Sequence, residues 1–260
     1  MRRTAVTLAA TVAALLLTAC TTLGGREPLV SDRPDFTESS TLIAPGRVQV
    51  ESGITISEEA DQRDISYGEV FGRIGLTDRL ELRVVPNSYT TVKAPGGAAS
   101  VSGREDPVLG VKIGLLGASE SPSLRPQLAL IAGTSLPLGS REFRAPHLQP
   151  EAKLLASWPL NDRVSFASNL NYSRPHDGLR SYDEYSASGS FAFTLTERVG
   201  FYTEGYAFAP QDGSDMLRKY ANAGSTLLLS PDLQLDARVG IGPSTKRGDY
   251  FFGVGVVRRW

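Results

Sequence analysis

Cysteine, histidine and long apolar runs are scarce in this 260-residue chain. It has one cysteine and two histidines, which excludes an intramolecular disulfide and a cluster of cysteine metal ligands. After residue 20, no stretch approaches the run of about 20 apolar residues that a membrane helix needs. The formal net charge is −1, so no electrostatic argument favours nucleic acid as a partner. A transmembrane β-barrel is not excluded, because its alternating strands average out in the mean hydropathy, here −0.14.

The first 19 residues have the form of a secretory signal peptide. Arg2 and Arg3 precede a short apolar run, Ala5–Leu17, which is too short to span a membrane as a mature helix. The run leads into LTAC, which resembles the lipobox of bacterial lipoproteins, in which the cysteine is diacylated after cleavage. We therefore predict a signal peptide over residues 1–19 and lipidation at Cys20. The alternative is ordinary cleavage that leaves this cysteine unmodified.

From residue 47 onward, the sequence alternates with a period of two. In the first example, Val48, Val50, Ile54 and Ile56 share one parity, and mostly polar residues share the other. This pattern is typical of a β-strand with one apolar face. It returns after each turn signal, with weaker versions at residues 65–76, 199–208 and 218–229. About twelve strands are predicted.

Short and long connections alternate between these strands. Short turns are expected at residues 77–79, 160–162, 196–197 and 230–232, with 117–124 somewhat longer. Longer polar loops are expected at residues 57–64, 86–105, 137–147, 173–182, 208–217 and 243–249. A transmembrane barrel has short periplasmic turns and longer outer loops. The sequence therefore predicts an all-β fold, an antiparallel transmembrane β-barrel of about 12 strands over residues 47–260. We expect it in the bacterial outer membrane, with its N-terminus lipid-anchored on the periplasmic side.

The polar parity of the strands is expected to face the lumen. Both charge signs occur there about equally, whereas a strongly selective ion pore would carry a ring of one sign. The mixed lining indicates internal ion pairing, a narrow pore or the passage of neutral solutes; alternatively, the charges only fill a closed barrel. The candidate lumen-lining residues are Glu51, Arg73, Glu81, Arg83, Lys112, Glu151, Lys153, Glu204, Asp236 and Arg238.

One predicted hairpin places two arginines against each other. With residues 77–79 as the turn, Arg73 lies opposite Arg83, and Glu81 is a diagonal neighbour. Two facing guanidinium groups repel unless carboxylates lie between them. We expect a further carboxylate to come from the segment that precedes the first strand.

That segment, residues 20–46, is called the leader. Its Gly, Pro, Ser and Thr clusters show no sustained period, so it is expected to form a lipid-anchored, irregular periplasmic segment. Its polar stretch, residues 32–38, is expected to enter the periplasmic mouth and pair its carboxylates with lumen arginines. The alternative is an ordered lead-in to the first strand without a gating role. The plug candidates are Asp32, Arg33, Asp35 and Glu38.

The sequence offers no support for an enzyme. Outer-membrane phospholipases use a Ser–His pair on a twelve-strand barrel, and such a pair must be in hydrogen-bond contact. Here His147 and His176 lie in predicted outer loops, and neither adjoins a recognisable nucleophile motif. We expect no enzymatic activity, no catalytic residue, no metal site and no cofactor.

Four stretches of the chain resemble one known family. They are SDRPDFTESS (31–40), GLTDRLELRV (75–84), DPVLGVKIGL (106–115) and the C-terminal GVGVVRRW. Together they resemble the transporter family named for the meta-pathway of phenol degradation, over roughly residues 31–260. The resemblance implies an outer-membrane barrel that passes aromatic or hydrophobic compounds. The lipobox departs from the simple signal-peptide form of that family.

These observations favour a passive outer-membrane channel or transporter for small solutes, hydrophobic or aromatic ones by resemblance. The alternative is a plugged structural or envelope-interaction lipoprotein barrel without transport activity. A soluble lipid-binding barrel is disfavoured, because the polar parity carries charges of both signs and many serines. The expected partners are outer-membrane lipid, the barrel assembly machinery and a small-molecule solute, but no nucleic acid.

Overall fold

The chain forms an antiparallel β-meander in a computed structural model. The structure describes residues 28–59, 62–86, 88–93, 99–118, 124–211, 217–243 and 248–260. The strands are β1 (Val48–Glu59), β2 (Gln62–Thr77), β3 (Leu80–Val85), β4 (Tyr89–Lys93), β5 (Val101–Arg104), β6 (Val108–Leu116), β7 (Gln127–Ser135), β8 (Gln149–Asn161), β9 (Val164–Ser173), β10 (Glu184–Thr194), β11 (Val199–Pro210), β12 (Arg218–Ser230), β13 (Leu233–Ile241) and β14 (Tyr250–Arg259). In these described ranges, no helix is long and apolar enough to cross a membrane.

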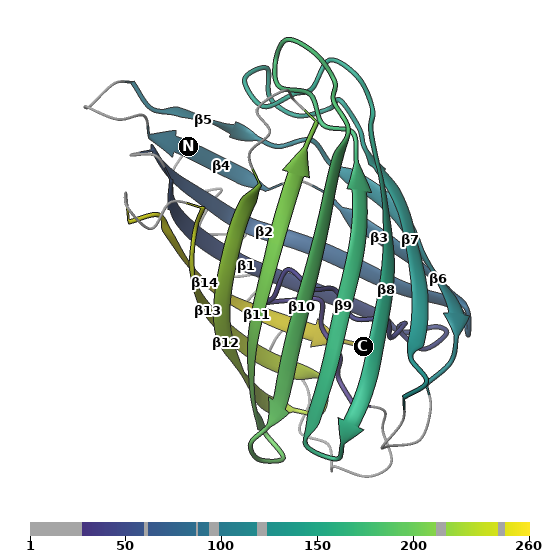
Figure 1. The fold of residues 1–260 in the computed structure, drawn as a ribbon. Coiled ribbons are helices and arrows are strands. Elements are labelled where there is room, and N and C mark those ends of the chain that lie inside the picture. Colours follow the sequence, from purple (N-terminus) through teal and green to yellow (C-terminus); the bar gives the residue numbers. More distant parts are fainter. Residues whose placement is uncertain are drawn as a thin grey trace.

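The sheet closes on itself because β1 pairs with both β2 and β14. From β6 to β14, each strand pairs antiparallel with the next, and β3 joins β2 to β6. β4 continues β3 along the wall and pairs with β2, and β5 continues into β6 and pairs with β4. The wall is therefore a closed barrel of twelve antiparallel strands, as predicted. Figure 1 shows the short turns at its lower end and longer loops at its upper end.

The predicted loop over residues 86–105 is wrong in part, because it contains β4 and β5. The sequence of β4 is YTTVK, and β-branched and aromatic residues of this kind favour a strand. Pro86, which has no N–H to donate to a ladder, lies at the break between β3 and β4. These two strands therefore belong to the wall at its long-loop end, as Figure 1 shows.

The two faces of the wall carry the predicted chemistry. On β6, Leu109 is 46% exposed on the outer face, whereas Lys112 is fully buried on the inner face. The predicted pairing of Arg73 with Arg83 is also confirmed. The register shifts between Gly75 and Thr77, and Thr77 pairs with Leu80, so the turn is shorter than the predicted 77–79. The outer face carries exposed apolar side chains around the circumference, among them Ile54, Leu109, Leu154, Phe191, Leu235 and Val254.

The leader lies inside the barrel. Its described part, residues 28–46, forms no strand, and Figure 1 shows it as a dark purple segment that crosses the interior. It leads directly into β1, since the N–H of Gly46 donates to the carbonyl of Gly75 on β2. The predicted signal peptide and Cys20 lie outside the described residues.

Candidate functional site

The leader is fixed by polar contacts that reach most of the wall. Its residues hydrogen-bond to side chains on β1, β2, β3, β6, β7, β8, β10, β11 and β13. Buried polar groups need such partners, because an unsatisfied one costs about 1–3 kcal/mol. The polar inner face of the strands thus supplies hydrogen-bond partners for the leader. The lumen that contains these contacts is therefore the candidate functional site.

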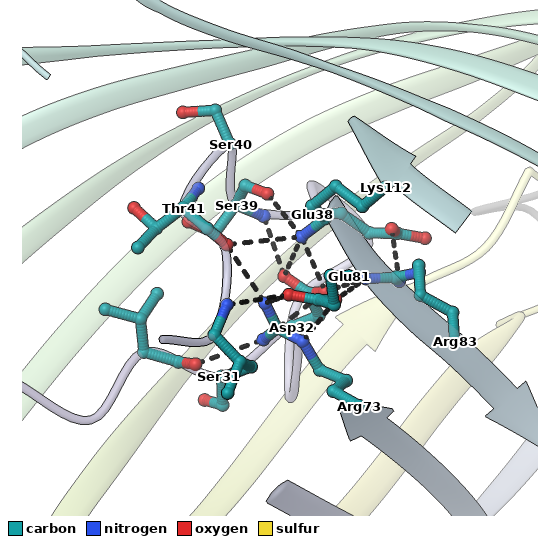
Figure 2. A network of polar contacts seen from close by, with 12 residues as sticks. Ser31, Asp32, Glu38, Ser39, Ser40, Thr41, Arg73, Glu81, Arg83 and Lys112 are labelled. Atoms are coloured by element: carbon teal, nitrogen blue, oxygen red, sulfur yellow. Dashed lines mark hydrogen bonds and ion pairs between the residues drawn. The ribbon is translucent and has the colours of Figure 1, made fainter. Parts of the chain in front are cut away.

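Asp32 lies at the centre of a buried cluster of cations (Figure 2). Its Oδ2 accepts hydrogen bonds from Arg83 at 2.7 Å and from Lys112 at 3.1 Å, and it lies 3.5 Å from Arg73. A buried cation without a counter-charge is strongly destabilising, so Asp32 allows these three side chains to be buried. Burial alone would raise the pKa of the Asp32 carboxyl, but the three cations hold it far below its usual value.

Two wall carboxylates complete this cluster. Glu81 forms a two-point pair with Arg73, at 2.9 and 3.0 Å. The Glu51 carboxylate accepts the backbone N–H groups of Asp32 and Arg33, at 3.2 and 3.0 Å. The predicted conflict between the facing arginines is thus resolved by carboxylates from both the wall and the leader.

Glu38 bridges Arg83 and one further cation, Lys153, on the side of the barrel near β8. Its Oε2 accepts from Arg83 at 2.6 Å, and its Oε1 accepts from Lys153 at 2.7 Å. Lys153 also lies 3.5 Å from Glu151 on its own strand. Asp32 and Glu38 therefore hold Arg83 from two positions of the leader.

A second anchor lies across the lumen on β11. The Glu204 carboxylate accepts the backbone N–H groups of Phe36 and Thr37, at 2.6 and 2.9 Å, and also the Thr37 hydroxyl. Asp35 does not pair with a lumen arginine as the sequence allowed; instead, its carboxyl accepts from Ser190 at 3.4 Å. Burial and the nearby Glu204 charge raise the pKa of the Asp35 carboxyl well above its usual value.

Arg33 fills a gap on the inner face of the wall, where one glycine of β1 and one of β14 have no side chain. A Cβ atom added to Gly53 would lie 2.2 Å from its Nη2, and one added to Gly255 would lie 2.6 Å from its Nε. These glycines pair with each other across the two strands. The Arg33 guanidinium bonds to Glu69 at 2.6 Å and lies 3.7 Å from Asp236. We call this gap the glycine slot.

The Glu69 contact depends on a bulge in β2. The β1–β2 register shifts between Glu51 and Gly53. Opposite this shift, Gly68 has φ 85° and Glu69 has φ 38°. A positive φ is unusual for a residue other than glycine, and bulges commonly re-aim a side chain. Here the bulge lets Glu69 meet the Arg33 guanidinium.

The alternation of the strands did not predict the apolar contacts with the leader. Leu42 packs against Ala129, Ile131 and Leu155, which are buried on the inner face. These side chains lie on the inward parity of β7 and β8, and the contact with Leu42 explains why they are apolar. The ring of Phe36 likewise stacks on an inward tyrosine of β11.

That stack belongs to an inward aromatic group. Phe36 lies 4.4 Å from Tyr206 between ring centroids, and Tyr206 lies 4.9 Å from Tyr220. Phe208 meets Phe36 edge-on at 5.2 Å. The sequence signal for this group is that Tyr206 and Phe208 share the inward parity of Glu204 on β11. Aromatic residues are common in any strand, so this signal alone did not indicate the group.

The leader divides the lumen into cavities. A cavity of about 550 Å³ on the short-turn side is lined by Asn161 and Arg163 near their turn, and by Arg33 and Asp35 of the leader. A cavity of about 390 Å³ on the long-loop side is lined by Ser88 and also by Arg33 and Asp35. These two leader residues therefore form part of the partition between the two spaces.

The remaining candidates have simpler surroundings. Arg238 donates to the Pro34 carbonyl at 2.7 Å and thus also holds the leader. His147 and His176 lie with ring centroids 6.3 Å apart, and the His176 Nδ1 accepts the N–H of Gly178. Across the residues that the structure describes, no three His, Cys, Asp or Glu side chains are grouped to hold a metal ion.

Comparisons with known proteins agree with this architecture. Residues 31–260 match the model of the family described as "Putative MetA-pathway of phenol degradation". Among curated proteins, no sequence matches the chain significantly.

Solved outer-membrane structures share the fold. The COG4313 outer membrane channel from Pseudomonas putida F1 has a TM-score of 0.60 and 15% identity, covering 88% of this chain and 100% of the other. The NanC porin has a TM-score of 0.54 and 9% identity, covering 81% and 98%. The KdgM porin has a TM-score of 0.50 and 12% identity, also covering 81% and 98%. At these identities, the likeness shows the barrel fold.

Proposed function

Because the chain belongs to the family described as "Putative MetA-pathway of phenol degradation", we propose that it is a passive outer-membrane channel for small solutes. The observation that carries this proposal is the partition of the lumen by the leader, with a cavity on each side. A barrel filled only to be stable would need no such spaces. The chain holds its own constriction, and passage requires the leader to shift.

The long-loop cavity favours solutes with an aromatic or apolar part. It is lined by the rings of Phe36 and Phe71 together with charged side chains. Aromatic rings pair favourably with other rings and with apolar groups. Solutes cross the barrel by diffusion down their concentration gradient, because the contacts described above only bind or pack and supply no energy for uphill transport.

The leader contacts also favour a second candidate, a plugged barrel that serves the envelope without transport. The buried pairs of Asp32 and the backbone bonds to Glu204 hold the leader at two distant walls. The two candidates differ in whether the intact protein conducts. A channel passes solutes with its leader present, whereas a plugged barrel has a path only after the leader is removed.

Deletion of residues 31–38 tests the proposal. In planar bilayers, the intact protein should show small conductance steps, and the deletion should enlarge them because the partition is gone. The double variant Asp32→Asn with Glu38→Gln serves where the deletion fails to fold, and Glu197→Gln, on an exposed turn, is the matched control. An intact protein without conductance or solute flux would favour the plugged barrel.

We also propose that Cys20 carries the lipid anchor and that the assembly machinery inserts the barrel. The support is the lipobox-like LTAC ending of the signal-like segment. Cys20→Ala should abolish incorporation of radioactive fatty acid, since the chain has no other thiol. Label that persists in this variant, or is missing from the wild type, would contradict lipidation.

A further inference from the structure

The long-loop cavity contains a carboxylate site that the leader itself occupies. Glu38 presents one oxygen to Arg83 at 2.6 Å and the other to Lys153 at 2.7 Å. Two cations on β3 and β8 thus hold one carboxylate between them. Charge-assisted hydrogen bonds of this kind are short and strong. The same wall would bind any carboxylate that takes the place of Glu38.

This site is less deeply buried than the rest of the Asp32 cluster. The side chains of Lys153, Glu38 and Arg83 are 23%, 15% and 9% exposed, whereas Arg73 and Lys112 are fully buried. Arg83 uses Nη1 for Asp32 and Nη2 for Glu38, so a solute that takes the place of Glu38 leaves the Asp32 bond in place.

The cavity also offers an aromatic surface beside the cations. Phe71 lies under the Arg83 guanidinium, 4.5 Å from its Cζ to the ring centroid. Phe36 lines the same cavity and belongs to the leader. A volume of about 390 Å³ lies within the range of small-molecule sites. The leader therefore presents a carboxylate and an aromatic ring, two residues apart, to one cavity.

We infer that small aromatic carboxylates are the solutes that bind here, by displacing the Glu38 carboxylate from Arg83 and Lys153. This inference rests on the proposed channel function and names its substrate class. Departure of Glu38 alone would leave two cations short of a partner, which is strongly unfavourable when they are largely buried. An anionic solute replaces that charge one for one, so its binding shifts the population towards a loosened leader.

Neutral aromatic compounds lack this coupling. A ligand shifts a conformational equilibrium only by its difference in affinity for the two states. Benzamide has the ring of benzoate but no charge to replace that of Glu38. Acetate has the charge but no ring to contact Phe71. The site should therefore rank benzoate above both.

Calorimetric titration of the purified full-length protein in detergent tests the inference. Benzoate should bind, and Glu38→Gln should bind it roughly tenfold more tightly, which corresponds to about 1.4 kcal/mol, because the internal competitor is gone. Lys153→Met should lose benzoate binding, and Glu197→Gln should behave like the wild type. Benzamide and acetate should bind weakly to every variant.

The outcomes separate this inference from the channel proposal. Equal binding of benzoate and benzamide would overturn the carboxylate site, and equal binding of benzoate and acetate would overturn its aromatic part. Weaker benzoate binding to a folded Glu38→Gln variant would show that Glu38 supports the site instead of competing for it. Because titration needs no passage, a conducting protein that ignores benzoate refutes only the inference, and a benzoate-binding protein without conductance refutes only the channel.

Discussion

Single residues of the leader are matched to single positions of the wall. Arg33 occupies the glycine slot, Asp32 pairs with three cations, and Phe36 stacks on an inward tyrosine. Each match involves a side chain whose size or charge would be unfavourable without its partner. The leader is therefore part of the folded interior, with the specificity of a core.

The glycine slot yields a residue-scale prediction. In Gly255→Ala, the new Cβ would lie 2.6 Å from Arg33 Nε and 2.8 Å from an Asp236 oxygen, so the guanidinium must leave. The loss of its charged hydrogen bonds costs about 2 kcal/mol, which is roughly a thirtyfold shift in leader docking. Conductance in planar bilayers should rise.

The control for this variant is Gly205→Ala. Its Cβ would meet the nearest atom, the carbonyl of Tyr220, at 3.8 Å, which is ordinary van der Waals contact. Both variants should fold, because the wall keeps its backbone ladder. Unchanged conductance in a folded Gly255→Ala protein would mean that Arg33 does not hold the leader.

At the scale of elements, strand alternation explains the wall almost completely. The outer face of β6 carries Leu109 and Val111, and the inner face carries Lys112. Val111→Arg should destabilise the barrel by roughly 2–4 kcal/mol near the midplane of the bilayer, since the charge would face lipid. Urea unfolding from lipid vesicles measures this, with Val111→Ile as control. Arg and Ile variants of equal stability would refute the assigned face.

Sequence reasoning located most of the strands, the pairing of Arg73 with Arg83 and the charged inner positions, because a period of two leaves little freedom in the register. It did not locate β4 and β5, although YTTVK favours a strand, because these short runs lie among the glycines and polar residues of the segment 86–105. It did not predict that Ile131 and Leu155, which share the inward parity, would pack against Leu42 of the leader. The glycine slot joins positions about 200 residues apart in the sequence, and local pattern carries no information about such a pairing.

At the scale of the whole molecule, the leader and wall together set a response to pH. The docked leader raises the pKa of Asp35 through burial and Glu204, so docking holds this proton more tightly than the free leader does. The contribution is fully favourable below the usual value of 3.8 and is lost as pH rises towards the docked pKa. Asp32 has a lowered pKa, so its contribution is present above its usual value of 3.8 and is lost progressively as pH falls below that value.

Conductance should therefore increase as pH rises from about 4 upward, as the Asp35 carboxylate forms beside Glu204. Asp35→Asn should remove most of this dependence and keep the leader docked, because the amide stays neutral at every pH. Planar-bilayer recordings across a pH series provide the measurement, and Glu197→Gln should retain the wild-type profile. A slope of the opposite sign in the wild type would exclude Asp35 as its source.

The two ends of the described chain meet at the closure of the barrel. Gly53 of β1 faces Gly255 of β14 around Arg33, and Arg259 Nη1 donates to the carbonyl of Pro28 at 3.0 Å. Both walls of the glycine slot therefore exist only once β14 has paired with β1. Closure of the barrel thus creates the site in which Arg33 docks, and the fit of the leader depends on a completed seam.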